Sequence, residues 1–179
     1  MNAARILYRT RQLWLSILVE PAPDELEIAY RYLNPKQREI FEKMQPGEQA
    51  HSLQVLRMLI AQGEEHPDLY KAALLHDVGK SRFPLKWWER VLIVLVKAVR
   101  PECVQRWGGE ETGLASFWRR AFVVAEHHPA WGAEIAAQAG VSPLGVSLIR
   151  KHQQDPVELA GDTLEDRLLL KLQAADDHN

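Results

Sequence analysis

The sequence of 179 residues has little cysteine and no long apolar run. Its single cysteine, Cys103, excludes an internal disulfide and any zinc site built from several cysteines. The apolar stretches at residues 13–19 and 91–99 fall well short of the roughly 20 residues needed to cross a bilayer. The first stretch also lacks the small-residue cleavage site of a secretory signal. We therefore expect a cytoplasmic protein without a membrane span.

An excess of basic charge is also missing. Lys and Arg number 22 against 24 Asp and Glu, which gives a net charge of -2. Sequence-independent binding to nucleic acid depends on neutralising many phosphates, so this balance argues against it, although a local basic patch stays compatible. We expect no sequence-specific binding to nucleic acid either. The apolar fraction of 46% is typical of a globular protein.

The two-residue alternation of β-strands is absent, whereas apolar residues recur every three or four positions. The pattern predicts an all-α fold. The sequence Asn34-Pro35 with Gln37 predicts a capped helix start. Prolines and glycines delimit the other expected helices and one loop at residues 100–115. The expected helices cover residues 3–19, a short second helix, 35–45, 48–62, 68–78, 84–99, 116–127, 130–139, 143–153 and 162–176.

Residues 1–45 contain none of the candidate site residues. We predict that they form an N-terminal helical extension packing on the core, and that residues 46–179 form the domain that carries the chemistry. Arg5, Arg9 and Arg11 near Trp14 are also compatible with a face for a membrane surface or a partner. The favoured interpretation is a helical cap whose apolar side packs on the core.

The most informative residues are His76 and Asp77, which follow the apolar residues Ala72 to Leu75. A buried imidazole beside a buried carboxylate needs compensation, since an unpartnered buried polar group costs on the order of 1–3 kcal/mol. A metal cation compensates both groups at once. Adjacent helical positions point about 100° apart, so both can reach one metal only near a helix end, and Gly79 is expected to provide that end.

Four further candidate ligands lie on apolar helical stretches. Any one of them alone is more typical of a hydrogen-bonded core residue than of a ligand. Together they favour a shared site, because helical bundles build metal centres from inward side chains of several helices. The four residues are His51, His128, His152 and Asp176.

The order of these residues resembles the HD superfamily of metal-dependent phosphohydrolases. The segment Leu-Leu-His-Asp-Val-Gly-Lys, residues 74–80, is similar to that family's signature. Residues 128–135 and 149–152 resemble the second and third histidine motifs of its binuclear members. The resemblance covers residues 48–177 and implies an HD-domain helical bundle with extra N-terminal helices. It leaves the role of those helices open.

The chain departs from the HD-GYP branch, which hydrolyses cyclic dinucleotides and carries paired histidines before a Gly-Tyr-Pro segment. Gln153 follows His152 here, and no Gly-Tyr-Pro segment is present. This difference disfavours cyclic di-GMP as the substrate. The retained histidines are more similar to those of the diadenosine tetraphosphate hydrolases in the same superfamily.

The resemblance implies one or two divalent metal ions. His51, His76, Asp77 and Asp176 would hold the first, and Asp77 would bridge to a second held by His128 and His152. Imidazole and carboxylate donors suit iron, manganese, zinc or nickel, so they do not select among these metals. Asp77 and Lys80 are the expected catalytic residues, with Lys80 meeting a phosphate; a solvated lysine at a helix end is the alternative.

Several assignments stay open at the level of sequence. His127 competes with His128, and the following Pro-x-x-Gly favours His128. Asp177 competes with Asp176, and the two preceding alanines favour Asp176. His66 and His178 are interpreted as surface residues. Trp87-Trp88 fits a stacking wall for a nucleobase, but we interpret the pair as core.

The sequence therefore predicts a metal-dependent phosphohydrolase that acts on a phosphate ester or anhydride of a small nucleotide-like molecule through a metal-activated water. One alternative is a di-iron oxygenase built on the same ligands. Another is a non-catalytic HD-type signalling or interaction module. The sequence determines neither the substrate, the metal nor the oligomeric state.

Overall fold

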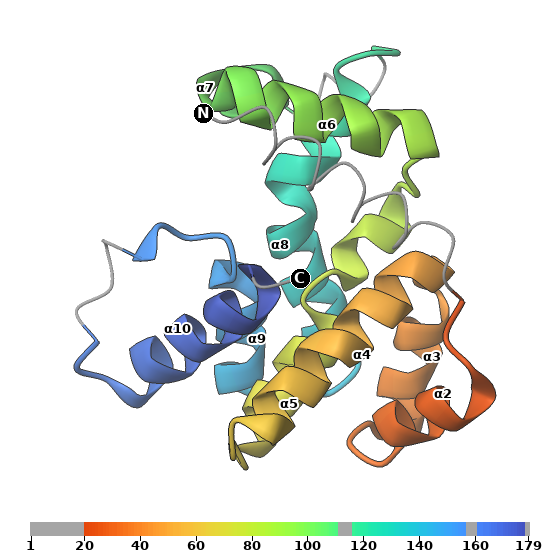
Figure 1. Ribbon diagram of the computed structural model, residues 1–179, viewed down its shortest axis with the longest axis vertical. Helices are drawn as coiled ribbons and strands as arrows, with labels where there is room; N and C mark the ends of the chain where they lie inside the picture. Colours follow the sequence, from red (N-terminus) through yellow and green to blue (C-terminus); the bar gives the residue numbers. More distant parts are fainter. Residues whose placement is uncertain (1–19, 111–115, 157–160, 178–179) are drawn as a thin grey trace.

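A computed structural model describes residues 20–110, 116–156 and 161–177. Every regular element in these ranges is helical, which confirms the predicted all-α class (Figure 1). None of their helices is long and apolar enough to cross a membrane. The predicted helix over residues 3–19, with Arg5, Arg9, Arg11 and Trp14, lies outside the described residues. The elements are α2 (Pro23–Tyr30), α3 (Pro35–Glu42), α4 (Pro46–Ala61), α5 (Pro67–Leu75), the 3-10 helix η1 (Val78–Arg82), α6 (Trp87–Val99), α7 (Pro101–Gly108), α8 (Arg120–Gln138), α9 (Pro143–Lys151) and α10 (Leu164–Asp177).

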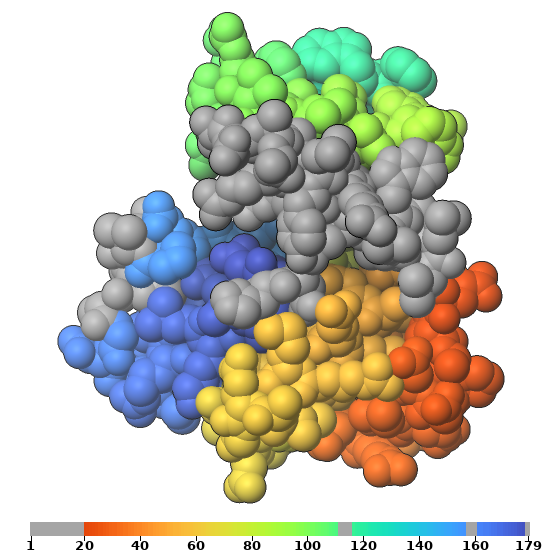
Figure 2. All heavy atoms as spheres, in the orientation of Figure 1, coloured from red at the N-terminus to blue at the C-terminus, as the bar shows by residue number. Residues whose placement is uncertain are grey.

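Helix α8 connects two parts of the molecule. Its C-terminal part packs against η1 and α9, and it also contacts α6 and α7. In Figure 1 α6 and α7 lie across the upper end of α8, while α4, α5, α9 and α10 lie around its lower part. Figure 2 shows the same division from outside, with α6 and α7 in green at the top and α4, α5 and α10 below. Any residue on α8 is thereby fixed relative to both parts.

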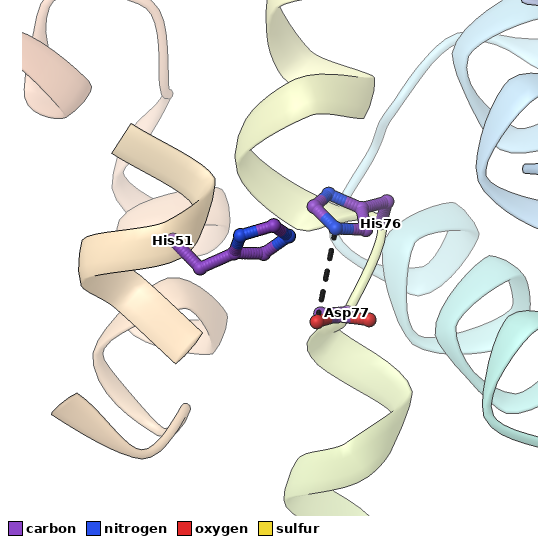
Figure 3. Close-up of side chains that lie close together, drawn as sticks. All are labelled: His51, His76 and Asp77. Atoms are coloured by element: carbon purple, nitrogen blue, oxygen red, sulfur yellow. Dashed lines mark ion pairs between the residues drawn. The ribbon is translucent and has the colours of Figure 1, made fainter. Parts of the chain in front are cut away.

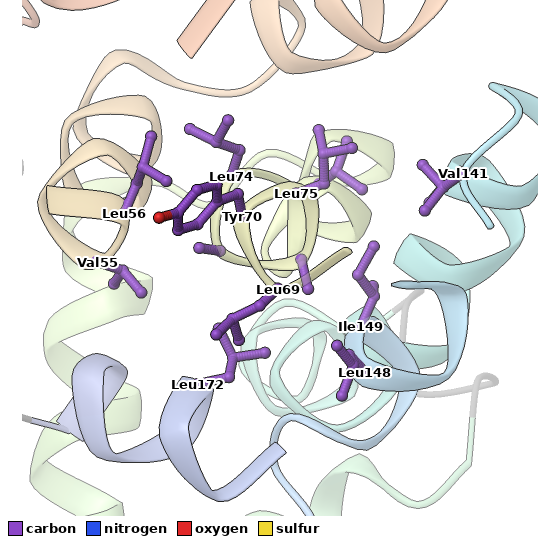
Figure 4. Packing of buried hydrophobic residues seen from close by; sticks show 14 of the residues in the cluster. Val55, Leu56, Leu69, Tyr70, Leu74, Leu75, Val141, Leu148, Ile149 and Leu172 are labelled. Carbon is purple, nitrogen blue, oxygen red and sulfur yellow. The ribbon is translucent and has the colours of Figure 1, made fainter. Parts of the chain in front are cut away.

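The main core lies among α4, α5, α9 and α10 (Figure 4). Leu56, Leu74 and Leu172 are fully buried there and come from three different helices. Phe41 and Met44 from the N-terminal extension belong to the same cluster. Burying a leucine side chain contributes about 1.5–3 kcal/mol, so this cluster holds the four helices and the extension together.

The capped helix start at Asn34 is confirmed. The Asn34 side-chain oxygen accepts a hydrogen bond from the Gln37 backbone N–H at 2.9 Å, and the Gln37 side chain accepts one from the Asn34 backbone N–H at 3.1 Å. Pro35 occupies the first helical position. The pair of bonds satisfies two backbone donors that the helix itself leaves unpaired.

The predicted loop at 100–115 is wrong over residues 101–108, which form α7. Pro101 starts this helix, as a proline at the first helical position commonly does. Its end is held by packing on α8: a Cβ on Gly108 would lie only 2.4 Å from the Phe122 carbonyl oxygen. Gly108 and Gly109 suggest a loop in the sequence. At Gly108, however, the absence of a side chain allows α7 to approach α8 closely.

The helices predicted at 116–127 and 130–139 are a single helix, α8, which runs through Pro129. Proline removes one backbone hydrogen bond and disfavours a helix interior by about 3 kcal/mol. In α8 that cost is offset by tertiary packing, since Pro129, Trp131 and Ala133 are all buried. The break expected from the sequence therefore does not occur.

The helix that begins near Asp68 ends at Leu75, four residues earlier than Gly79. His76 caps the helix, Asp77 follows in a turn, and Gly79 lies inside η1. His76 and Asp77 do lie at a helix end, as predicted. The predicted position of that end, at Gly79, was wrong.

Gly79 allows η1 to lie directly against α8. A Cβ added at Gly79 would stand 2.0 Å from the His128 carbonyl oxygen and 2.6 Å from the Gly132 nitrogen. Both neighbours are backbone atoms of α8, so neither can rotate away. The two glycines bring the backbone after Asp77 onto the turn of α8 that carries His128.

Two acidic residues with little exposure tie α6 to the rest of the molecule. Glu48 on α4 pairs with Arg90 at 2.6 Å, and Arg90 also contacts Gln45. Both Glu89 carboxylate oxygens accept from the same Arg120 nitrogen, Nη1, on α8, at 2.6 and 2.7 Å. The same carboxylate accepts a bond from the Lys86 backbone N–H at the start of α6. These charged contacts add to the partial apolar burial of α6, whose Ile93 packs on the smaller core cluster and whose one fully buried residue is Glu89.

The Gly79→Ala variant is expected to lose about 1–3 kcal/mol of unfolding free energy or more, because the new methyl group overlaps the α8 backbone. Thermal and urea unfolding of the metal-free protein measure the change. Gly109→Ala is the matched control, because its Cβ would meet only the Gln105 oxygen at 3.2 Å. Equal stability of Gly79→Ala and the unsubstituted protein would contradict the close approach.

The Glu89→Ala variant is expected to lower the unfolding free energy by about 2–4 kcal/mol, since it leaves Arg120 without its carboxylate. The value lies below that of a fully buried pair because the Arg120 side chain is 26% exposed. Glu39→Ala breaks the exposed Glu39–Lys43 pair and should change stability little. A similar small change for both variants in urea unfolding would show that the Glu89 contact does not hold α6.

Candidate metal centre

Six of the predicted site residues converge from five helical segments. His51 comes from α4, and His76 and Asp77 lie in the turn after α5 (Figure 3). His128 comes from the middle of α8, His152 caps the end of α9, and Asp176 belongs to the last turn of α10. Residues separated by up to 125 positions in the chain are thus neighbours in space.

The first group surrounds the His76 Nε2 atom. His51 Nε2 lies 2.7 Å from Asp176 Oδ1. His76 Nε2 lies 3.6 Å from the same Asp176 oxygen and 3.7 Å from Asp77 Oδ2. One donor atom from each of His51, His76 and Asp77 lies within 4.8 Å of the others, so the group has the dimensions of a metal site.

The second group surrounds the His128 Nε2 atom. It lies 3.3 Å from Asp77 Oδ1 and 3.3 Å from His152 Nε2. Donor atoms that bind one ion at about 2.0–2.2 Å stand roughly 3.0–3.5 Å apart, and these separations match that spacing. Asp77, His128 and His152 are all buried.

Asp77 belongs to both groups, and its two oxygens point in different directions. Oδ2 faces His76 and the Lys80 ammonium, whose Nζ lies 2.6 Å away. Oδ1 faces His128. A carboxylate in this orientation can bridge two cations, one on each oxygen.

In each of the three buried imidazoles, Nδ1 faces a backbone carbonyl oxygen of its own helix and Nε2 faces the centre. The Nδ1 atom of His76 lies 2.9 Å from the Ala73 carbonyl oxygen, and that of His152 lies 2.8 Å from the Ile149 oxygen. His128 Nδ1 lies 2.9 Å from the Ala125 oxygen and 3.0 Å from the Val124 oxygen. A carbonyl oxygen only accepts, so each Nδ1 carries the proton and each Nε2 has a lone pair toward the centre.

The electrostatics favour deprotonated ligands. Burial lowers the pKa of His152 to about 3 and lowers the pKa of His128 below its ordinary value. Burial alone would raise the pKa of the Asp77 carboxyl, but the nearby Lys80 ammonium and the His76 and His128 side chains outweigh it and hold that pKa well below its usual range. The pKa of Asp176 is lowered in the same way by His76 and His51, against the effect of burial. Neutral imidazoles and ionised carboxylates are the forms that bind metals.

Among the described residues three buried side-chain atoms have no hydrogen-bond partner, Ser52 Oγ, Gln173 Oε1 and His76 Nε2, and the last of these faces the centre. His76 Nε2 forms no hydrogen bond with any described residue, although its side chain is only 1% exposed. Leaving such an atom unpaired costs about 1–3 kcal/mol. A divalent cation between His76, Asp77 and His51 would satisfy it, and nitrogen and oxygen donors of this kind suit the first-row metals. The residues present therefore fit a metal.

The two ligand alternatives are separated by position. His127 points away from the centre: its Nε2 lies 3.0 Å from the Gly108 carbonyl oxygen of α7, and its ring stacks on Trp131. Asp177 is exposed, whereas Asp176 contacts His51. The structure thus brings His128 and Asp176 into the cluster, and their role as ligands remains a prediction.

The other predicted residues are distributed more widely. Lys80 stands beside Asp77 with its side chain 23% exposed. Trp87 is 56% exposed, so the core interpretation is wrong for it. His66 is partly exposed and caps α5, where it accepts a bond from the Asp68 N–H. His178 lies outside the described residues.

Two glutamines lie near the centre although the sequence did not predict a place for either of them there. The Gln153 side-chain nitrogen lies 3.5 Å from His128 Nε2. Gln173 is 7% exposed and donates to the backbone carbonyls of His152 and Gln154 at 3.1 and 2.7 Å. Gln173 stands three residues before Asp176, so the helical spacing puts both on one face of α10. That spacing is the signal that could have identified it.

Comparison with known proteins gives one result. No curated protein and no solved structure matches the chain significantly. The sequence matches the HD domain family over residues 49–177, well over half of its length, and all six clustered residues lie in that range. The chain belongs to the HD domain family.

Proposed function

We propose that this protein is a metal-dependent phosphohydrolase that acts on a phosphate ester or anhydride of a small nucleotide-like molecule. The observation that carries the proposal is the pair of donor groups that share Asp77. Four imidazoles and two carboxylates meet there in a mostly buried site, and HD domains are generally metal-dependent hydrolases. His51, His76, Asp77 and Asp176 would hold one ion, and Asp77, His128 and His152 a second.

Bound divalent ions would lower the pKa of a coordinated water and offset the charge of phosphate oxygens. The chain itself contributes orientation and charge. Asp77 holds the two donor groups at a fixed separation, since both of its oxygens are engaged. Lys80 places an ammonium 2.6 Å from Asp77, where it can attract a phosphate oxygen as a point charge. The partial exposure of His51 and Asp176 leaves this side open to a substrate.

A nucleotide-like substrate is supported by a cavity of about 610 Å³ at the start of α4 and α6. Its lining includes Trp87, Trp88 and Lys86, a combination that can stack on a base and attract a phosphate. Gly47 also lines the cavity, and His51 lies one turn further along the same face of α4, about 6 Å away. None of the six clustered residues lines the cavity itself.

Metal content and phosphate release test the proposal on one sample of protein purified without chelators. We expect one or two equivalents of iron, manganese, zinc or nickel, and phosphate release from one class of substrate. The screen includes nucleoside mono- and triphosphates, dinucleoside polyphosphates and cyclic dinucleotides. Protein that takes up no metal even after repletion would contradict the proposal. Oxygen consumption with two irons and no phosphate release would identify a di-iron oxygenase instead.

Asp77→Ala is expected to abolish turnover and to lower metal content at both sites, because it removes the shared ligand. His127→Ala is the matched control: this histidine precedes His128 but faces Gly108, so metal content should be unchanged. Elemental analysis and single-turnover phosphate release measure both. Full metal content and activity in Asp77→Ala would overturn the assignment.

His152→Ala separates a one-metal from a two-metal centre. Since His152 belongs only to the second group, we expect the loss of one equivalent of metal, with the other retained. Titration of the metal-free protein with Mn²⁺, followed by equilibrium dialysis, counts the sites. Loss of both equivalents would mean that the two groups bind a single ion or depend on one another.

A further inference from the structure

The Nδ1 atoms of His76, His128 and His152 each donate to a backbone carbonyl oxygen. These carbonyls lack a backbone donor of their own for two different reasons. The last four carbonyls of an α-helix have no donor within the helix. Ala73 lies in the last turn of α5 and Ile149 in the last turn of α9, so helix ends free the acceptors of His76 and His152. Both histidines cap their helices.

His128 has no such helix end. It lies in the interior of α8, a helix of 19 residues, where the N–H four positions later normally occupies each carbonyl. Residue 129 would supply the donor for the Ala125 carbonyl, but residue 129 is proline and has no N–H. The Ala125 oxygen is therefore available, and His128 Nδ1 lies 2.9 Å from it.

We propose that Pro129 is a positioning residue that fixes the tautomer of His128. Because Pro129 has no N–H, the Ala125 carbonyl has no backbone donor. Its oxygen can therefore accept a hydrogen bond from His128 Nδ1–H although the helix is continuous. The Nε2 lone pair then faces Asp77 and His152. The second contact of Nδ1, to the Val124 oxygen at 3.0 Å, is shared with the helix ladder and is weaker support alone.

The position of the proline supports this role. A proline in a helix interior is unfavourable by about 3 kcal/mol, so it requires a compensating reason. Pro129 is buried, and α8 continues through it under the packing of η1, where Gly79 approaches Gly132. Residues that contradict the local helix preference are expected mainly at functional sites, where their function offsets the cost. The proline thus supplies in mid-helix what a helix end supplies to His76 and His152.

Two variants test the proposal in the metal-free, full-length protein. Pro129→Ala and Pro129→Ser both restore an N–H that can take the Ala125 carbonyl. Nitrogen-15 NMR of the imidazoles distinguishes the Nδ1–H from the Nε2–H form. We expect the Nε2–H form of His128 to become populated in both variants, while His76 and His152 keep the Nδ1–H form. Pro101→Ala, at the start of α7, is the matched control and should change no histidine.

Metal affinity provides a second readout. The inference rests on the proposed function only where it concerns metal. Loss of an interaction that orients a ligand typically weakens binding 10- to 100-fold, so Mn²⁺ affinity at the second site should fall by about that factor. Helix stability should not fall, because alanine is the better helix former, and circular dichroism checks this.

The outcomes are distinguishable. His128 wholly in the Nδ1–H form in both variants would overturn the inference, whether or not the protein hydrolyses phosphate. A changed tautomer in a protein without phosphatase activity would support the inference while the proposed function fails. Variants that lose helicity would also overturn it, since Pro129 would then serve the packing of α8 itself.

Discussion

The buried charge of Asp77 is the constraint on which the centre depends. A carboxylate that is 4% exposed cannot remain ionised without positive charge or hydrogen-bond donors around it. The Lys80 ammonium on η1 supplies that positive charge at 2.6 Å, while His76 and His128 lie on its other sides, from the end of α5 and from α8. Gly79 makes this arrangement possible, because any larger residue would separate the turn of Asp77 from the backbone of His128. The close backbone contact and the buried charge therefore require one another.

The backbone also contributes to the electrostatics. His76 and His152 cap the C-terminal ends of α5 and α9, and Asp176 lies in the last turn of α10. The C-terminal end of a helix carries a partial negative charge of about half an electron, which favours a nearby cation. Three such ends meet at one place, in addition to the two carboxylates. The negative electrostatic potential at the site thus comes partly from helix ends and not only from its side chains.

The sequence predicted which side chains cluster better than it predicted the helix limits. His51, His76, Asp77, His128, His152 and Asp176 stand out because polar side chains interrupt apolar faces, and burial brings such faces together. The helix limits depend on tertiary packing instead. Pro129 and Gly108 suggest a break and a loop, yet both lie in helices because α8 packs against η1, α9 and α7. Local propensities of a few kcal/mol or less cannot reveal contacts between distant segments. Gln173 escaped notice, and Gln153 was noted only as a departure from the HD-GYP pattern, because glutamine is not a usual metal ligand.

The uneven distribution of aromatic residues has a spectroscopic consequence. The five tryptophans among the described residues are Trp87, Trp88, Trp107, Trp118 and Trp131, all on or beside α6, α7 and α8. Helices α4, α5, α9 and α10 contain none. The emission of these five tryptophans therefore reports mainly on one part of the molecule, whereas far-ultraviolet dichroism averages over every helix. If α6 and α7 separate from the bundle before it unfolds, the two signals will follow different denaturation curves, and a single midpoint will not describe the protein.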